Sequence, residues 1–502
     1  MITNSVINSR QADRRSLISR LFGWSPSPPN VTIRETAWLD GLRGLAAFLV
    51  MANHYNFEWL SMAADAPFGA TILEDKKLDD VWHYQKGDRL WEPWRLPIAR
   101  LFICSGASMV TVFFVLSGFV LSWGPLQNIR SGRYDKFARS LGSTTFRRWA
   151  RLYLPCLIVS GLYLLHKIIM DYSGIGSVFA EIWNYIKVGQ RWANPLNIDR
   201  IAPIASGNPY NFVMWTIPFE FSGSLFVFIT LLAVGRSPNH HRRLLIVAGL
   251  SVYALLSAYW GFWLFGSGLF LADYVSHAGG FLALSQKTSG RGRLIWTMVF
   301  ILGLVLLGLP SGGGWYSWAG YQWIRKIPLP QQIQSRDHVI DRFWWGCGAI
   351  LTIAGACHLT PVRHFFQLPI FRYLGRISFM LYLIHFVVDV DYSQPIRHTL
   401  YALLCTKEYN KIHQSDVYIT SFLQTIYIPL LLWVITAPVT LILANWLEVH
   451  IDRPCTNFAK WLDNEFVKGA QSARHTLHEE QLPLCTNDDR LEMSEGSRRH
   501  ET

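Results

Sequence analysis

Charged residues are scarce in this chain of 502 residues. Asp, Glu, Lys and Arg make up only 16% of it, whereas 51% is hydrophobic and 22 residues are tryptophan. A soluble domain usually has about a quarter of its residues charged. The composition therefore favours a membrane protein over a soluble one.

The seven cysteines include no CxxC pair, and they stand at positions 104, 156, 347, 357, 405, 455 and 485. Four of them lie inside apolar runs, where a thiol behaves as a small hydrophobic side chain. The spacing predicts neither a disulfide framework nor a zinc site. We expect no metal centre.

Three other features are absent. Residues 1–36 contain no apolar core of the signal-peptide kind, so we expect the first apolar helix to act as an uncleaved insertion signal. No repeat of fixed period occurs. The net charge is +12, but the basic residues lie between apolar runs instead of forming one polar face, which excludes nucleic-acid binding.

Ten apolar runs are long enough to cross a bilayer. They predict an all-α, polytopic membrane helix bundle of about ten transmembrane helices. The last run contains two prolines and is expected to be kinked. The runs are 38–60, 98–123, 150–170, 212–234, 244–260, 262–284, 293–310, 342–358, 373–391 and 418–446.

The links between the runs alternate in charge. Every second link is short and basic, and Asp135 is the only acidic residue among these links. Basic links stay in the cytoplasm, so both termini are predicted to be cytoplasmic. We divide the chain into an N-terminal tail at 1–37, a transmembrane domain at 38–455 and a largely disordered C-terminal tail at 456–502.

The first run carries charge where charge is costly. Its sequence from Leu39 to His54 is LDGLRGLAAFLVMANH. At about 100° and 1.5 Å per residue, Arg43 and His54 lie within about 20° of one helix face and about 16 Å apart along the axis. Asp40 falls near the same face. The axial distance from Arg43 places His54 at about mid-membrane depth.

Two more ionisable residues are predicted at a similar depth. They are Glu220 in WTIPFEFSG and His385 in GRISFMLYLIHF. Ionisable side chains inside a membrane are costly and usually functional, so we expect His54, Glu220 and His385 to share one cavity. The alternative is that each histidine only forms a hydrogen bond between helices.

The cytoplasmic end carries a different chemistry. The sequence FRRWARLYLP places Arg147, Arg148 and Arg151 at the inner mouth of the third helix, and guanidinium groups suit phosphates. Lipid-headgroup anchoring is the alternative. Ser117-Gly118 approaches the same side and lets a ligand or another backbone come close.

These segments together resemble the acyltransferase-3 family of multi-span membrane acyltransferases, in its fungal form. The resemblance covers residues 38 to 455, and its motifs occur in family order. One departure is Asp452-Arg453-Pro454, where the family has Glu-Arg-Pro. The matching motifs are WLDGLRGLAAFLVMANH, FFVLSGFVLSW, FRRWARLYLP, WTIPFEF and GRISFMLYLIHF.

The resemblance implies transfer of an acyl group, most often acetyl from acetyl-CoA, to a hydroxyl group. It implies that Arg43 and His54 are essential and that the arginines of FRRWARLYLP lie on the CoA side. Acyl-CoA is then a co-substrate and no cofactor is permanently bound. The fungal form favours a small lipophilic metabolite as the acceptor over a glycan or lipid.

The expected mechanism uses neutral His54 as the general base for the acceptor hydroxyl. Glu220 or Asp40 would orient it, and His385 would bind the acceptor or donate to the oxyanion. A covalent acyl-histidine stays an alternative. Arg147, Arg148, Arg151 and Ser117 would bind acyl-CoA.

Two other classes of protein stay open. A proton-coupled transporter would use the histidines and Glu220 as a proton relay, but it gives the arginines no role. A sensor would bind acyl-CoA without turnover. In every case we expect the bilayer of the endoplasmic reticulum or plasma membrane as a partner and no obligate protein partner.

Overall fold

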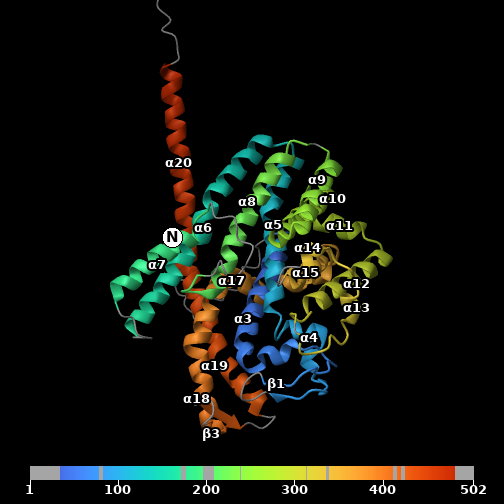
Figure 1. Ribbon diagram of the computed structural model, residues 1–502. Coiled ribbons are helices and arrows are strands. Elements are labelled where there is room, and N and C mark those ends of the chain that lie inside the picture. The colour runs from blue at the N-terminus through green and yellow to red at the C-terminus, as the bar shows by residue number, and fades with distance from the viewer. Residues whose placement is uncertain are drawn as a thin grey trace, which may run out of the picture.

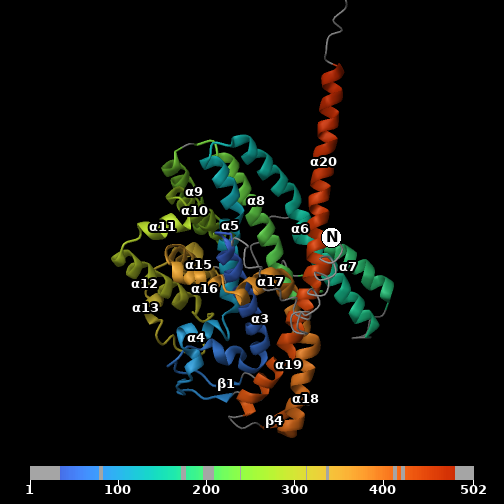
Figure 2. The ribbon, with the colours of Figure 1, turned by 180° about the vertical axis from the view of Figure 1, so that it is seen from behind.

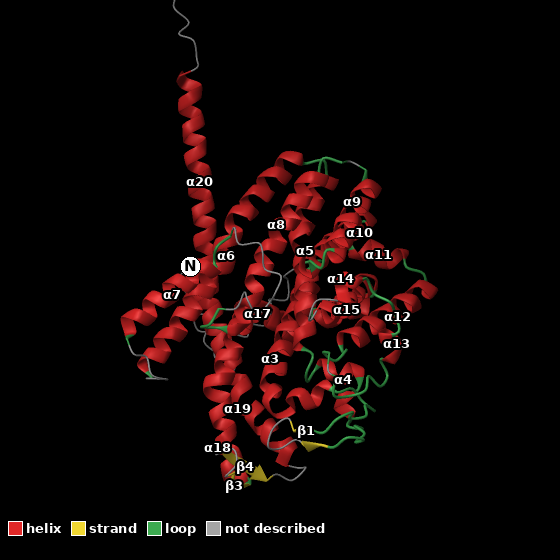
Figure 3. Ribbon diagram, viewed as in Figure 1, coloured by secondary structure: helices red, strands yellow, loops and turns green. Residues whose placement is uncertain are grey.

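The structure is a computed structural model of the whole chain. It is built mainly of helices, with short strands at one end (Figures 1 and 3). It describes residues 34–77, 83–170, 177–195, 208–237, 239–312, 314–334, 339–410, 415–419 and 424–480.

Each of the ten predicted apolar runs overlaps a long helix, because continuous apolar sequence without turn residues favours helix in a bilayer. The prolines of the last run, Pro429 and Pro438, lie inside its helix. The ten helices are α3 (Ala37–Asp65), α5 (Gly106–Arg130), α6 (Tyr134–Ile169), α8 (Thr216–Val234), α9 (His240–Leu256), α10 (Trp260–Ala278), α12 (Gly290–Leu307), α15 (Val339–His358), α17 (Pro369–Val388) and α19 (Gln424–Leu447).

Fewer helices meet the length and hydropathy that a membrane span requires. Among the described residues six do so, or seven if the pair Ile340–His358 and Thr360–Phe366, bent by 106°, forms one span. This supports an all-α membrane bundle, in which six or seven of the ten expected spans meet this requirement. The six are Gly106–Arg130, Tyr134–Ile169, Phe212–Val234, Gly290–Leu307, Pro369–Leu404 and Tyr427–Lys468.

Short elements connect the long helices. The helical ones are η1 (Pro93–Arg95), α4 (Pro97–Leu101), α7 (Val178–Trp192), η3 (Phe212–Trp215), α11 (Phe281–Lys287), α13 (Gln322–Arg325), α14 (Gln331–Gln334), α16 (Thr360–Phe366) and α18 (Gln394–Leu404), with π-helical turns η4 (Asp389–Ser393) and η5 (Glu448–Asp452). The antiparallel strand pairs are β1 (Lys76–Lys77) with β2 (His83–Tyr84) and β3 (Thr406–Asn410) with β4 (Ser415–Ile419).

Helices α3, α5 and α17 occupy the middle of the bundle. Figures 1 and 2 place them between α9 to α13 on one side and α6, α7 and the C-terminal helix α20 (Arg453–Glu480) on the other. The strand pairs lie at one end of the bundle, and α20 extends away at the opposite end.

Glycine sets the close packing of α3 on α17. A Cβ on Gly44 would lie 2.2 Å from the backbone nitrogen of Gly375, and one on Gly375 would lie 2.3 Å from the carbonyl oxygen of Asp40. The two helices run parallel. Only residues without a side chain permit this backbone approach.

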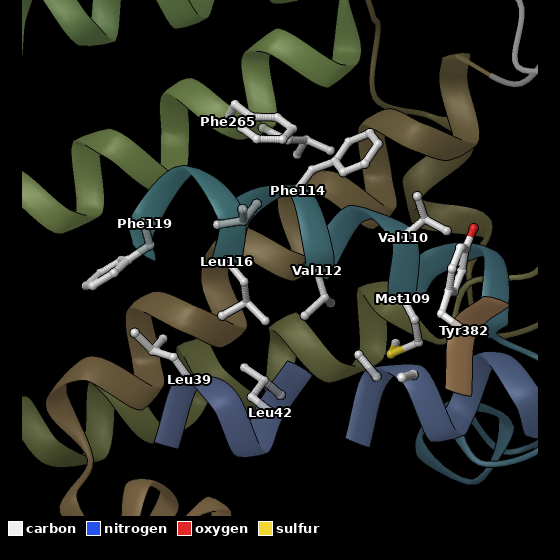
Figure 4. Close-up of a cluster of buried hydrophobic side chains, with 14 of the residues drawn as sticks. Leu39, Leu42, Met109, Val110, Val112, Phe114, Leu116, Phe119, Phe265 and Tyr382 are labelled. Atoms are coloured by element: carbon white, nitrogen blue, oxygen red, sulfur yellow. The ribbon is translucent and has the colours of Figure 1, made fainter. Parts of the chain in front are cut away.

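The other face of α3 packs against α5 through apolar side chains. Leu39 and Leu42 on α3 meet Val112 and Leu116 on α5 (Figure 4). Gly118 brings α5 equally close to α10, where its Cβ would lie 2.1 Å from the Phe265 carbonyl oxygen. Helix α5 is therefore held on two sides by elements distant in sequence.

The predicted tails differ in outcome. Residues 1–33 lie outside the described part of the chain. The C-terminal segment was expected to be largely disordered from 456, but α20 continues as a helix to Glu480. The side chains of Asp463 and Phe466 on this helix contact α6, so the first part of α20 packs against the bundle.

Candidate active site

A cavity of about 250 Å³ lies between α3, α5, α6, α8, α17 and η5. Leucine, valine and phenylalanine side chains form most of its α5 wall. Its other walls combine apolar and polar side chains. The polar lining of the whole cavity consists of Arg43, Ser117, Arg148, Arg151, Thr216, Glu220, Arg376, Ser378, Tyr382 and Asp452. Of the eight predicted site residues, five line this cavity, and they are Arg43, Ser117, Arg148, Arg151 and Glu220.

Arg43 is fixed at one end of the cavity by two helices. Its Nη2 lies 3.2 Å from Asp40 on α3 and donates to the Gly375 carbonyl oxygen at 2.9 Å, while its Nε donates to Ser378 at 3.0 Å. The glycine contacts between α3 and α17 bring these groups within reach. Arg43 therefore presents a positioned cation to the cavity.

Glu220 forms the centre of a second polar group. Its Oε1 accepts a hydrogen bond from Ser117 at 2.5 Å and pairs with Arg148 Nη2 at 2.9 Å. Arg148 also donates to Ser224 at 2.8 Å. The side chains of Arg148 and Glu220 are only 11% and 16% exposed, so this pair joins α5, α6 and α8 inside the bundle.

The three predicted phosphate-binding arginines separate into three environments. Arg148 is held by Glu220. Arg147 turns towards α20, where its Nε lies 3.4 Å from Asp463, and it is absent from the cavity lining. Arg151 lines the cavity with an exposed side chain and forms no hydrogen bond with the described residues. Arg151 is therefore the best placed of the three to meet an anion.

Sequence reasoning missed Arg376 and did not assign a role to Asp452. Arg376 lines the cavity and pairs with Glu448 at 3.0 Å, and Glu448 also accepts from Arg453 at 2.7 Å. Asp452 faces Arg151 at longer range. The available signal was the Asp452-Arg453-Pro454 motif, because charged residues after a long apolar run often lie at a membrane site.

Tyr382 lies at the end of the cavity opposite the arginines. Its hydroxyl donates to the Val213 carbonyl oxygen at 2.6 Å and shares a 2.8 Å hydrogen bond with Thr216. Figure 4 shows Tyr382 beside Val110, with Leu39 and Phe119 at the other end of the α5 segment. Tyr382 was also missed, although it stands three residues before His385.

His54 and His385 lie together beyond Tyr382. Their ring centroids are 5.0 Å apart, and the His385 ring is 5.8 Å from that of Tyr382. His385 is fully buried, and its Nδ1 lies 3.1 Å from the Leu381 carbonyl oxygen. His54 is half-buried and also faces Phe386 at 5.6 Å.

The structure brings the two histidines together but does not place either of them beside Glu220. The histidines meet each other, but neither is among the lining residues of the cavity that contains Glu220. Glu220 is engaged by Arg148 and Ser117, and Asp40 pairs with Arg34 at 3.1 Å and with Arg43. Neither carboxylate contacts His54, so neither orients it in this structure.

The fold and the site define an integral membrane protein with an internal cavity that runs from a cluster of arginines towards a histidine pair. Residues 36–449 match the acyltransferase domain, and the chain belongs to the acyltransferase-3 family. The protein is therefore an acyltransferase. The match covers most of the chain and every residue that lines the cavity except Asp452.

Three fungal proteins resemble the chain. It is 28% identical to O-acetyltransferase PaAT-1 of Phomopsis amygdali over 70% of this chain and 72% of the relative. It is 25% identical to acyltransferase R4 of a Phoma species over 73% and 85% of the two chains. It is 24% identical to acyltransferase clz18 of Cochliobolus lunatus over 72% of this chain and 84% of the relative. No solved structure matches the chain.

Proposed function

We propose that this acyltransferase moves an acyl group, most often acetyl, from acyl-CoA to a hydroxyl group of a small lipophilic metabolite. One observation carries the proposal. The cavity has positioned cations at one end and Tyr382 at the other, and the His54–His385 pair lies just beyond Tyr382. Anion binding and proton transfer thus occupy opposite ends of one path.

The position of the cations sets the direction of the donor. Its phosphates lie at the arginine end, where Arg151 is open and Arg43 is held in place. Guanidinium groups bind phosphate through charge-assisted hydrogen bonds. The pantetheine arm then follows the α5 wall past Ser117 towards Tyr382. In this arrangement Arg148 holds Glu220 and Ser117 in place.

His54 acts as the general base. It takes the proton of the acceptor hydroxyl while the hydroxyl oxygen forms a bond with the thioester carbon. The carbon–sulfur bond then breaks, and the thiolate of CoA takes the proton from His54. The reaction is balanced, with an ester and free CoA as products and no net proton released.

The names of the relatives support oxygen as the acceptor atom. One relative is named an O-acetyltransferase, which favours acetyl as the acyl group and oxygen as the acceptor. All three relatives are fungal, and this supports a small secondary metabolite as the acceptor. A wall of leucine, valine and phenylalanine on α5 suits a lipophilic molecule.

We further propose ten spans with both chain ends on the donor side. A helix overlaps each predicted run, and the short basic links alternate with longer links in which acidic residues balance the basic ones. Arg43 and Arg151 then lie near the cytoplasm, where acyl-CoA is available. Epitope tags at the two termini should both be inaccessible in intact cells and both become accessible once the plasma membrane alone is permeabilised. A tag that is accessible in intact cells, or only after internal membranes are also opened, would contradict this topology.

The test uses purified protein, radiolabelled acetyl-CoA and a fungal metabolite extract. We expect label in an extractable product, and His54→Ala should abolish it while the protein still inserts and folds. His364→Ala is the matched control, because His364 is exposed on α16. Retained label without product would instead indicate a binding protein, and the absence of any interaction would favour transport. Full turnover by His54→Ala would exclude His54 as the base.

A further inference from the structure

His54 has no acidic partner in the described part of the chain. Its ring forms no hydrogen bond or ion pair with another described residue, and its aromatic neighbours are His385 and Phe386. A histidine that acts as a general base needs one nitrogen free of hydrogen and aimed at the substrate. Some other group must therefore fix its tautomer.

His385 has its own tautomer fixed by the backbone. Its Nδ1 lies 3.1 Å from the Leu381 carbonyl oxygen. A carbonyl oxygen can only accept a hydrogen bond, so Nδ1 carries the hydrogen. In the neutral ring Nε2 then holds an unshared electron pair and can only accept.

Nε2 of His385 is unused within the protein. The residue is 0% exposed, and this atom has no hydrogen-bond partner among the described residues. A buried polar atom without a partner costs free energy. It therefore indicates a partner that arrives during the reaction or through a small movement.

The neighbouring ring lies at a suitable distance. Two imidazoles joined by an N–H···N hydrogen bond of about 2.9 Å have their centroids about 5 Å apart. The centroids of His54 and His385 are 5.0 Å apart, with the ring planes tilted by 48°. Because no hydrogen bond joins the two rings as they stand, the pairing requires the half-buried His54 ring to rotate until one of its N–H groups faces Nε2.

We propose that His385 is a positioning residue whose Nε2 accepts a hydrogen bond from His54 and so keeps the opposite nitrogen of His54 unprotonated. This inference rests on the proposed function of His54 as the base. When His54 takes the proton of the acceptor, its ring becomes positive, and the Nε2 electron pair stabilises that charge. A neutral His385 with this tautomer cannot donate to an oxyanion from Nε2.

The packing of α3 on α17 supports this pairing. Ser378 and His385 lie within about 20° of one face of α17, and Arg43 and His54 lie within about 20° of one face of α3. Arg43 bonds Ser378 at the cavity end, and the two histidines meet at the other. One parallel helix pair thus positions both the donor-side cation and the base.

The test compares two substitutions of His385. Gln places an amide oxygen near the former Nε2 position and can still accept a hydrogen bond from His54. Asn is shorter and reaches only the former Nδ1 position. We expect His385→Asn to lower kcat by about 10- to 100-fold, by analogy with the loss of a group that orients a metal-ligating histidine. His385→Gln should keep most of kcat, and both should keep the KM for acetyl-CoA.

A chemical probe tests the pairing without using acyl transfer. Diethyl pyrocarbonate reacts with the unprotonated nitrogen of His54, and mass spectrometry of the His54 peptide gives the rate. We expect a slower reaction in His385→Asn than in the original protein or His385→Gln. Unfolding would instead expose His54 and speed the reaction.

The two measurements separate the two proposals. If the original protein transfers no acyl group from acetyl-CoA, the proposed function fails, and the probe still tests the pairing. Equal probe rates in all three proteins would overturn the positioning role. Complete loss of transfer in both variants with an unchanged probe rate would also overturn it, since His385 would then act directly on the substrate.

Discussion

Arg148 Nη2 lies 2.9 Å from Glu220 Oε1, and both side chains are mostly buried. This ion pair connects α6 to α8 beside the cavity. It also explains how a carboxylate persists among apolar helices, because its charge is compensated and Ser117 provides a further hydrogen bond.

The pair should contribute to stability. Glu220→Ala leaves the Arg148 charge buried without its partner and should lower the free energy of unfolding by about 3–5 kcal/mol. Thermal unfolding in detergent measures the effect. Arg453→Ala is the control, because Arg453 is 52% exposed and its partner Glu448 keeps Arg376; it should cost less than about 1 kcal/mol. Equal losses of stability in Glu220→Ala and Arg453→Ala would contradict a structural role for the Arg148–Glu220 pair.

The close contact of Gly44 with Gly375 should also contribute to the stability of the protein. Gly44→Ala places a Cβ 2.2 Å from the Gly375 nitrogen, which forces α3 and α17 apart and should cost about 1–3 kcal/mol or more. Gly249→Ala on α9 is the control, since no atom lies near its added Cβ and alanine favours a helix by about 1 kcal/mol. A stable, active Gly44→Ala protein would show that the helices are further apart.

Arg151 should determine donor affinity. Its loss removes a charge-assisted contact worth about 1.5–3 kcal/mol, so Arg151→Ala should raise the KM for acetyl-CoA by roughly 10- to 100-fold, with a smaller change in kcat. Arg291→Ala is the control, because Arg291 is exposed on the far helix α12. Steady-state kinetics measures both, and an unchanged KM for Arg151→Ala would place the phosphates elsewhere.

Tyr382 should limit the length of the acyl group. Tyr382→Ala removes the ring that closes the cavity, so the preference for acetyl-CoA over longer acyl-CoA donors should fall by about tenfold. Relative kcat/KM values for acetyl-, butyryl- and hexanoyl-CoA give the result. Tyr253→Ala, at a side chain that is 70% exposed, should leave the preference unchanged. An unchanged preference in Tyr382→Ala would mean that the acyl group lies elsewhere.

The sequence placed the helices and several of the site residues. Apolar runs predicted where the long helices form, since backbone groups in a bilayer must bond within their own segment. The spacing of Arg43 and His54 placed them on one face of α3, and both take part in contacts with α17. The number of spans depends on more than apolar runs, since among the described residues only six helices, or seven with the bent pair, meet the length and hydropathy of a span.

The sequence did not predict which side chains on different helices contact one another. Glu220 was expected beside His54 on the basis of depth, but depth fixes only one coordinate. The rotation of α8 about its axis turned Glu220 towards Arg148. Arg147 likewise contacts Asp463 on α20 and does not line the cavity.

The sequence by itself thus determined the chemistry of this protein, a histidine and several arginines along apolar helices in the order of a known acyltransferase family. The tertiary structure decided which of these groups meet. Glycine contacts such as Gly44 on Gly375 set the spacing and register of α3 and α17, and side-chain hydrogen bonds act only over about 3 Å. Partners more than 300 residues apart, such as His54 and His385, therefore depend on packing that helix periodicity alone does not define.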